Sequence, residues 1–587
     1  MNRIEPWIET IDGRAPILLI APHGGRAGSA SRAKLNPKVN DLHTAEITRE
    51  LARRLDAPAI INSGMDRNQL DCNRLPQLIA DAPWLLDLIA DKLESLVSAN
   101  LHATVLLIHG WNIIQPRIDF GLGLRRFGME LRPPGAARVS ASDDFINGTL
   151  AALANRLDQS GVSPSHGMRY PGGGAHNLLQ AFTSRHCDSP NPALAKIASI
   201  SARGAVDAAQ LELSVAVRMP GPMRERCLDS LTYAFANHRP ITPRARASEP
   251  LTIIRSHAPR QVAPRGAAVA PPSRIGIELF DPAARIGAMA SFDLGPGGFG
   301  ARIMLLLGAR RVALFTGEGV VQRTDATLSL GPLSLAARDG GLDLRFCGPA
   351  VIVPDGAAYL SIERALSDGE LDASLDVRAH VALSAGSVDF AQAFAAVDGA
   401  QQPGSPPSSF GAVEGTVTVA GASTPINAVA RAGLSFTGLG PQRFDSRRMM
   451  WACFPGDRGP RAMELRSVLV DGGENQRTGR VLGARGWSDC NVSRVDIDAP
   501  SIDAPPASVA AQFTHAGGGN QSLIGHVESF IPLSRPGPDQ TRIYTALGFA
   551  TFNLGENRGA GMFEFSRRSD TLAGANDADD ESSGDDD

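Results

Sequence analysis

The chain has 587 residues, 43% of them hydrophobic, and its 57 basic and 61 acidic side chains give a formal net charge of −4. This length exceeds what one hydrophobic core normally supports, so we expect a multidomain protein. The balanced charge, without a long basic run, argues against a nucleic-acid partner, and no apolar stretch reaches the roughly 18 residues of a membrane-spanning helix. We therefore predict neither a nucleic-acid partner nor a membrane span.

The cysteines and the first residues of the chain bear on its location. Six cysteines are scattered without any Cys-x-x-Cys spacing, which is typical of reduced thiols. The first fourteen residues lack the basic-then-apolar pattern of a secretory signal. Both features predict a cytoplasmic protein.

An apolar run at residues 17–21 stops abruptly at Pro-His-Gly-Gly, with the histidine at position 23. Because a strand that is buried on both faces does not alternate, this run predicts a parallel β-strand. Ligands of open α/β sheets bind outside the carboxyl ends of the strands. His23 is therefore a candidate metal ligand, and a histidine in a tight turn is the alternative.

A predicted amphipathic helix follows, with Ile47, Leu51 and Leu55 in one apolar stripe. Asp41 stands at its N-cap or just before it, and it is the carboxylate nearest to His23 in this part of the chain. Asp41 is a second candidate metal ligand. The alternative is that it only caps the helix, which is the commoner use of an aspartate at such a position.

A second short strand is predicted at residues 59–61, followed by a polar loop that carries Arg67, Asn73 and Arg74. The fork of an arginine side chain binds carboxylates in a bidentate manner, so this loop is a candidate site for an acidic substrate. A surface ion pair of Arg67 with Asp66 or Asp71 is the alternative.

A helical pattern from residue 84 to 97 leads into an apolar strand at residues 103–108, which also ends in His-Gly, at His109 and Gly110. Independent core histidines would not need to share this position at a strand end. His109 is therefore a third candidate metal ligand. Strands that alternate with helices over about 240 residues predict an open α/β sheet.

Two later segments complete the candidate site. Residues 170–174, Tyr-Pro-Gly-Gly-Gly, form either a flexible flap over the site or a long turn. Glu212 is the one carboxylate in the apolar run at residues 208–213, where a buried strand would require a partner such as arginine or metal-bound water. We take Glu212 as the candidate general base, with a structural ion pair as the alternative.

The second half of the chain has a different composition. Residues 248–274 are rich in Pro, Ala, Arg and Ser and predict an interdomain linker. Glycine-punctuated β segments then predict an all-β region, which a Pro/Ser stretch at residues 401–409 divides into domains at 275–400 and 410–572. The acidic tail at residues 573–587 has no apolar anchor and is predicted to be disordered.

Several short motifs follow one another in the first part of the chain. In order they are Pro22-His23-Gly24-Gly25, Asp41 ahead of Thr44-Ala45-Glu46-Ile47, Arg67-x3-Asp71-x-Asn73-Arg74, Ile108-His109-Gly110, Gly172-Gly173 and Gln210-Leu211-Glu212. Over about residues 10–240 this ordered set resembles the N-formylglutamate amidohydrolase family, which is related in fold to zinc carboxypeptidases.

The resemblance implies a zinc-dependent amidohydrolase with an α/β fold, for which we predict the boundaries 1–247. The residues that match its metal positions are His23, Asp41 and His109. Asn73 and Arg74 match the motif that holds the substrate carboxylate, and Glu212 matches the catalytic glutamate. We predict a substrate-binding set of Arg67, Asn73, Arg74, Gly172, Gly173 and His176.

This chain departs from the related enzymes at two points. The carboxypeptidases carry a glutamate three residues after the first histidine, where this chain has Arg26, so His43 and Glu46 remain alternatives to Asp41. The strand before His109 lacks the Asp-x-His pattern that is common in the family. A carboxylate there usually fixes the tautomer of a histidine ligand.

Residues 413–421, 449–454 and 525–529 resemble the two-barrel, lipocalin-like proteins related to hydroxyneurosporene synthase and tocopherol cyclase. That resemblance implies a barrel pair able to enclose an apolar ligand. Residues 431–436 read Arg-Ala-Gly-Leu-Ser-Phe where related proteins tend to carry Arg-Asp-His-Ser-Trp-Gly. Because the acid and the histidine are missing, we expect binding or a structural role rather than chemistry.

The sequence thus predicts a zinc-dependent amidohydrolase for an N-acyl acidic amino acid or a similar small carboxylate, fused to a β-barrel ligand-binding module. The alternative is a non-catalytic protein that binds an apolar ligand and carries a degenerate hydrolase domain. Bound zinc would favour the first hypothesis, and a bound apolar molecule without metal would favour the second.

Overall fold

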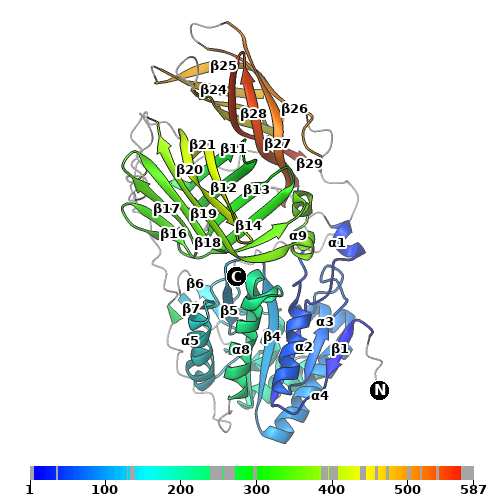
Figure 1. Cartoon of the computed structure of the whole chain (residues 1–587). Coiled ribbons are helices and arrows are strands. Elements are labelled where there is room, and N and C mark those ends of the chain that lie inside the picture. The colour runs from blue at the N-terminus through cyan, green and yellow to red at the C-terminus, as the bar shows by residue number, and fades with distance from the viewer. Residues whose placement is uncertain are drawn as a thin grey trace. The chain divides into compact units, whose positions relative to one another are not determined.

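The computed structural model describes residues 5–34, 37–127, 130–132, 139–237, 254–255, 272–294, 300–384, 390, 394, 408–436, 444–455, 461–470, 475–484, 486–498, 504–515, 519–536 and 541–569. The chain forms two compact units, whose described residues lie before residue 261 in the first and between 261 and 573 in the second (Figure 1). The predicted acidic tail at 573–587 and most of the predicted linker at 248–274 lie outside the described residues.

The first unit is built on a mixed sheet of seven strands in the order β1-β3-β2-β4-β9-β5-β8. Strands β3, β2, β4 and β9 are parallel neighbours, whereas β1 and β5 run antiparallel to β3 and β9. This confirms an α/β unit, with a mixed rather than a purely parallel sheet. The strands are β1 (Ile8–Ile11), β2 (Ile17–Ala21), β3 (Ala59–Asn62), β4 (Ala103–Trp111), β5 (Arg117–Gly121), β8 (Ser163–His166) and β9 (Val206–Ser214).

The helices connect these strands. The predicted helices appear as α2 and α4, and the stripe of Ile47, Leu51 and Leu55 is buried as expected. The helical elements are α1 (Ser29–Ala33), α2 (Thr44–Leu55), α3 (Leu75–Asp81), α4 (Pro83–Asn100), η1 (Phe145–Leu150), α5 (Ala151–Gln159), η2 (Leu178–Phe182), η3 (Ser184–His186), α6 (Pro192–Ala202), α7 (Val215–Arg218) and α8 (Pro222–Ala236).

A small second sheet in this unit has the order β10-β7-β6. Its strands are β6 (Arg125–Phe127), β7 (Glu130–Arg132) and β10 (Ile254–Arg255). Strand β10 lies within the segment at 248–274 that the composition predicts to be a linker. The Ile254–Arg255 pair adds to β7 by backbone hydrogen bonds, which composition does not reveal.

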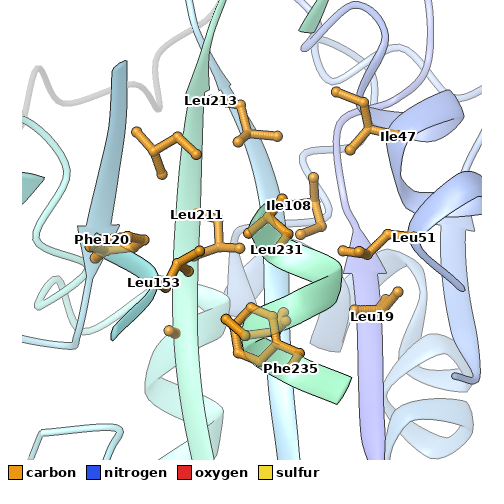
Figure 2. Close-up of a cluster of buried hydrophobic side chains, with 14 of the residues drawn as sticks. Leu19, Ile47, Leu51, Ile108, Phe120, Leu153, Leu211, Leu213, Leu231 and Phe235 are labelled. Carbon is orange, nitrogen blue, oxygen red and sulfur yellow. The ribbon is translucent and has the colours of Figure 1, made fainter. Parts of the chain in front are cut away.

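The two faces of the main sheet pack against two separate apolar clusters. Ile108 and Leu211 belong to the cluster that includes α2 and α8, and Figure 2 shows them beside Leu51, Leu231 and Phe235. Leu107 of β4 and Ala208 of β9, which alternate with Ile108 and Leu211 along these strands, face the other cluster. Because side chains alternate along a strand, this arrangement sends His109 and Glu212 to the face opposite Ile108 and Leu211.

The described part of the second unit consists mainly of β-strands, with the helical segments η4 (Gly356–Leu360) and α9 (Ile362–Asp368) and the helical residues Phe390 and Phe394. Eleven antiparallel strands form one sheet, in which β14 also pairs with β18. They are β11 (Pro272–Asp281), β12 (Ile286–Asp293), β13 (Gly300–Leu307), β14 (Arg311–Glu318), β15 (Gln322–Arg323), β16 (Thr327–Leu330), β17 (Leu333–Arg338), β18 (Gly341–Val353), β19 (Glu370–Leu383), β20 (Ser408–Val419) and β21 (Ala422–Phe436).

The remaining strands close into a barrel around an apolar cluster that includes Met450, Leu465 and Phe563. They are β22 (Phe444–Cys453), β23 (Ala462–Val470), β24 (Asn475–Gly483), β25 (Gly486–Asp498), β26 (Ser508–His515), β27 (Gln521–Pro536), β28 (Arg542–Leu554) and β29 (Asn557–Ser569). The all-β character predicted for this half is confirmed.

The sequence placed the division within this half at residues 401–409, but the change of sheet comes later. Strands β20 and β21 pair with β19 and β11, so residues 410–436 continue the eleven-stranded sheet. The Pro/Ser stretch lies between two strands of one sheet, and composition does not distinguish such a connection from a boundary. No helix in the described ranges is both long and apolar enough to cross a membrane.

Candidate metal centre

Three of the predicted residues meet at the carboxyl ends of β2 and β4. His23 stands two residues beyond β2, His109 lies in β4, and Asp41 precedes α2 with its backbone N–H bonded to the carbonyl oxygen of His23 at 2.9 Å. One ligand atom of each residue lies within 4.8 Å of the other two, and all three residues are buried. The sequence placed His109 after its strand, but β4 continues to Trp111.

The spacing of these atoms suits a metal ion. The Nδ1 atoms of His23 and His109 lie 3.2 and 3.3 Å from the same Oδ2 atom of Asp41. A tetrahedral zinc ion with bonds of about 2.0–2.2 Å holds its ligand atoms about 3.3–3.6 Å apart. Two imidazole nitrogens and one carboxylate oxygen are also a donor set that catalytic zinc accepts. The residues therefore fit the ion that the sequence predicts.

A fourth residue, Asp71, orients the first ligand. Its Oδ1 lies 2.6 Å from Nε2 of His23, so that a proton on Nε2 leaves the Nδ1 lone pair directed at Asp41 and His109. Burial raises the pKa of Asp71, but the opposing effects of His23 and Arg67 are stronger and keep it well below its usual range. Asp71 is thus placed to fix the tautomer of His23.

The protonation states of the three residues favour cation binding. Burial lowers the pKa of His109 to about 4, helped by the positive charge of His23 and Arg67. Burial opposes ionisation of Asp41, yet its bonds to His109 and His23 hold its pKa well below the ordinary value. The result is a neutral imidazole beside a carboxylate, the states in which both residues bind metals.

His23 differs from His109 in its titration. Burial and Arg67 lower its pKa, but Asp71 and Asp41 on either side outweigh them and leave it raised. A cation would therefore compete with a proton for Nδ1 of His23, and metal affinity would depend on pH.

Glu212 lies on β9, directly beside His109 in the parallel register of β4 and β9. Paired residues share a face of the sheet, so both side chains point the same way. Glu212 is 4% exposed and accepts a hydrogen bond from Nε2 of Gln210. Burial, followed by the negative charge of Asp41, raises its pKa well above the ordinary value. Within the described part of the chain it has no ion pair, so the structural alternative lacks a partner.

The predicted arginine loop lies against the same carboxylates. Arg67 points its guanidinium at Asp41 and Asp71, at 3.6 Å from each, and donates to the carbonyl oxygen of Val39. Of the two carboxylates named in the alternative, Arg67 therefore pairs with Asp71, but Asp71 is buried and this pair does not lie on the surface. Asp66 instead accepts backbone N–H groups from residues 28, 31 and 68.

The segment of Asn73 and Arg74 makes backbone contacts with the residues that follow the glycine-rich loop. The backbone of Arg74 bridges that of Asn177, and the N–H of Leu75 donates to the carbonyl oxygen of His176 at 2.8 Å. The Oδ1 atom of Asn73 is buried without a hydrogen-bond partner among the described residues, which leaves it available to a ligand. The side chain of His176 is exposed.

The glycine-rich loop is a pinned turn rather than a flap. Gly172 has a φ of +75° and accepts a bond from Nε2 of Gln180 at 2.8 Å. A Cβ atom on Gly173 would lie 1.9 Å from the carbonyl oxygen of Leu124, so only glycine fits there. The loop therefore presents fixed backbone to the site.

The alternatives to Asp41 lie apart from this cluster. His43 is the N-cap of α2 in a left-handed conformation, and Glu46 lies in the first turn of that helix. Neither belongs to the group of atoms that could hold one cation, in the residues that the structure describes.

Sequence reasoning missed Arg218, which is only 1% exposed. Its guanidinium donates to the carbonyl oxygen of Leu42 and to Oδ1 of Asn112, both at 2.8 Å. It therefore ties the segment that carries Asp41 to the end of β4. A Cβ atom at Gly110 would lie 2.3 Å from its Nη1. The sequence offered no signal for it other than its place six residues after Glu212.

Two further arginines, Arg125 and Arg185, lie beside Gly173 and were also missed. Arg185 donates to Oε1 of Gln180 at 3.1 Å and to the carbonyl oxygen of Gly173 at 3.4 Å. A Cβ atom on Gly173 would lie 2.8 Å from Cγ of Arg125, so the side chain of Arg125 packs against Gly173. Burial, followed by the nearby charge of Arg125, lowers the pKa of Arg185. This pair places positive charge near the predicted carboxylate loop.

No family model matches the chain, and no curated protein matches it. A solved structure described as AttH from Nitrosomonas europaea is 13% identical, covers 50% of this chain and 91% of its own, and has a TM-score of 0.29. Kievitone hydratase from Nectria haematococca is 10% identical, with 52% and 95% covered and a TM-score of 0.29. N-formylglutamate amidohydrolase from Ralstonia eutropha is 12% identical, with 39% and 95% covered and a TM-score of 0.26. At these values the function has to be argued from the site itself.

Proposed function

We propose that the first unit is a zinc-dependent amidohydrolase that cleaves the amide bond of an N-acyl acidic amino acid or a similar small carboxylate. The observation that carries this proposal is the buried meeting of His23, Asp41 and His109, with Glu212 on the adjoining strand and facing the same side. A non-catalytic domain would have no need of an unpaired buried carboxylate beside three ligand atoms, because burying such groups is costly.

In this proposal the Nδ1 atoms of His23 and His109 and the Oδ2 atom of Asp41 hold the ion. Zinc, when bound, acidifies a water molecule and polarises the amide carbonyl. Glu212 accepts the proton of the attacking water and passes it to the amide nitrogen. The C–N bond breaks as the new C–O bond forms, which releases a carboxylic acid and an amine.

Substrate recognition falls to the loops at the same end of the sheet. Arg74 and the unpartnered Oδ1 of Asn73 would hold the carboxylate and an N–H group of the substrate. Gly172 and Gly173 give a rigid backbone wall, and His176 lies on the exposed rim. Arg67 faces Asp41 and Asp71, so its role is to balance their charge rather than to anchor substrate.

The test uses the purified full chain. We expect about one zinc ion per chain by elemental analysis, and release of amine from N-formyl- or N-acetylglutamate that stops with a chelator and returns with zinc. A folded chain that takes up no zinc from a zinc-supplemented buffer would contradict the proposal. Solvent extraction of the same sample checks whether the second unit binds an apolar ligand. Such a ligand without metal would favour the binding-protein hypothesis.

A further inference from the structure

Positive charge gathers on one face of the closed barrel in the second unit. Arg447 pairs with Ser566 across β22 and β29, and Ser566 pairs with Thr545 of β28. Arg466 of β23 pairs with Met449, which lies two residues after Arg447 on β22. Thr545 pairs with Leu533 of β27, and Arg535 lies two residues after Leu533. Paired residues and residues two apart share a face, so all of these side chains point the same way.

This face points away from the interior of the barrel. The residues that alternate with it, Met450, Ala546 and Phe563, belong to the apolar cluster inside. Interior and exterior positions alternate along the strands of a barrel, so the arginine face is the outer one. Arg466 and Arg535 are exposed, which leaves their guanidinium groups accessible to a ligand.

Glu564 is an acidic side chain that lies among these arginines. Glu564 shares their face through its register with β22, its side chain is 12% exposed, and it accepts bonds from Nη2 of Arg447 and from the hydroxyl of Ser566. Arg466 and Arg535 have no hydrogen bond or ion pair among the described residues. These three arginines and Glu564 carry a formal +2, and Arg274 adds positive charge that acts on Arg535.

The arginines are close enough to influence one another. After burial, the charge of Arg447 is the strongest influence that lowers the pKa of Arg466, and the same holds for Arg535. Like charges brought together without a matching acid cost free energy, which a bound anion would recover.

We propose that the outer barrel face formed by Arg447, Arg466 and Arg535 over Glu564 binds a small ligand that carries a doubly charged phosphate group. The excess positive charge of the cluster favours a highly charged anion such as a phosphate dianion. Arginine forks match the oxygen geometry of phosphate, and Glu564 holds Arg447 in place for this contact. This inference is independent of the proposed hydrolase, because every residue in it belongs to the second unit.

The test is thermal denaturation of the full chain titrated with inorganic phosphate, with sodium chloride keeping the ionic strength constant. The variant combines Arg466→Gln with Arg535→Gln. The matched control is Arg558→Gln, which removes an exposed arginine near the other end of β29. We expect phosphate to raise the Tm of the wild type and of the control, and to bind the double variant about tenfold more weakly or worse.

A parallel titration with phenyl phosphate distinguishes a free phosphate ligand from a phosphate ester. Tighter binding of the ester supports an ester as the ligand, and equal binding supports free phosphate. Circular dichroism confirms that the variants fold. The proposal is overturned if phosphate leaves the wild-type Tm unchanged, or if the double variant binds it as tightly as Arg558→Gln does.

Discussion

Replacing His109 with alanine should strongly weaken zinc binding while leaving the first unit folded. Apparent zinc affinities of about 10–16 kcal/mol for four-ligand sites correspond to about 3–4 kcal/mol for each ligand. Loss of one ligand therefore predicts an affinity lower by roughly two to three orders of magnitude. His109 also fills buried space between β4 and Asp41, so we expect a loss of about 1–3 kcal/mol in the free energy of unfolding.

The assay is zinc content after dialysis against a zinc buffer set by a competing chelator, together with urea unfolding of each protein. His176→Ala is the matched control, because it removes an exposed histidine from a loop at the same end of the sheet. The control should retain the wild-type zinc content. If His109→Ala bound zinc with wild-type affinity, the argument from the three converging ligand atoms would be refuted.

Three further predictions concern the surroundings of the ligands. In the metal-free chain, the raised pKa of Glu212 means that stability is complete below the unfolded pKa of about 4.5 and is lost as pH rises toward the folded value, at up to about 1.4 kcal/mol per pH unit. Glu212→Gln should flatten this slope in urea melts between pH 5 and 8, and an unchanged slope would count against a protonated buried Glu212. Asp71→Asn should weaken zinc binding by about 10–100-fold in a chelator competition, because the carboxylate that orients His23 is lost; an unchanged affinity would exclude that role. Replacing Arg125 and Arg185 together with alanine should raise KM for an N-acylglutamate by about tenfold and leave kcat and the KM for N-acylalanine unchanged. The side-chain carboxylate of N-acylglutamate is absent from N-acylalanine. An equal loss for both substrates would show that these arginines do not bind that side-chain carboxylate.

The sequence predicted most of the elements that carry the candidate ligands. A run of apolar residues that ends at His-Gly is a strong local signal, and both β2 and β4 formed where this pattern occurs. The ordered motifs added the segment before α2 and the strand of Glu212. These predictions succeeded because burial on both faces imposes a continuous apolar pattern that can be seen in a short window.

What the sequence could not supply are contacts made at long range by single side chains. Asp71 bonds to His23 across 48 positions, and Arg218 reaches the carbonyl oxygen of Leu42 across 176. Asp71 belongs to a motif, but that motif does not specify the contact with His23, and Arg218 belongs to no motif. The predicted division at residues 401–409 differs from the observed change of sheet for a related reason. The pairing of β11 with β21 is set by register and not by local composition.

The balance of charge explains why these long-range residues belong to the site. Asp41 and Asp71 bring two negative charges into the buried cluster, Arg67 and Arg218 bring two positive ones, and His23, whose pKa is raised, adds a third when it is protonated, while Glu212 holds a proton. A divalent cation would disturb this balance, and the least costly response is to release protons from the neighbouring acidic groups. Glu212, whose pKa is raised by burial and by Asp41, is the group that such a cation would affect most. The surroundings that keep Glu212 protonated in the empty cluster are therefore the same ones that would make it a proton acceptor once a cation is present.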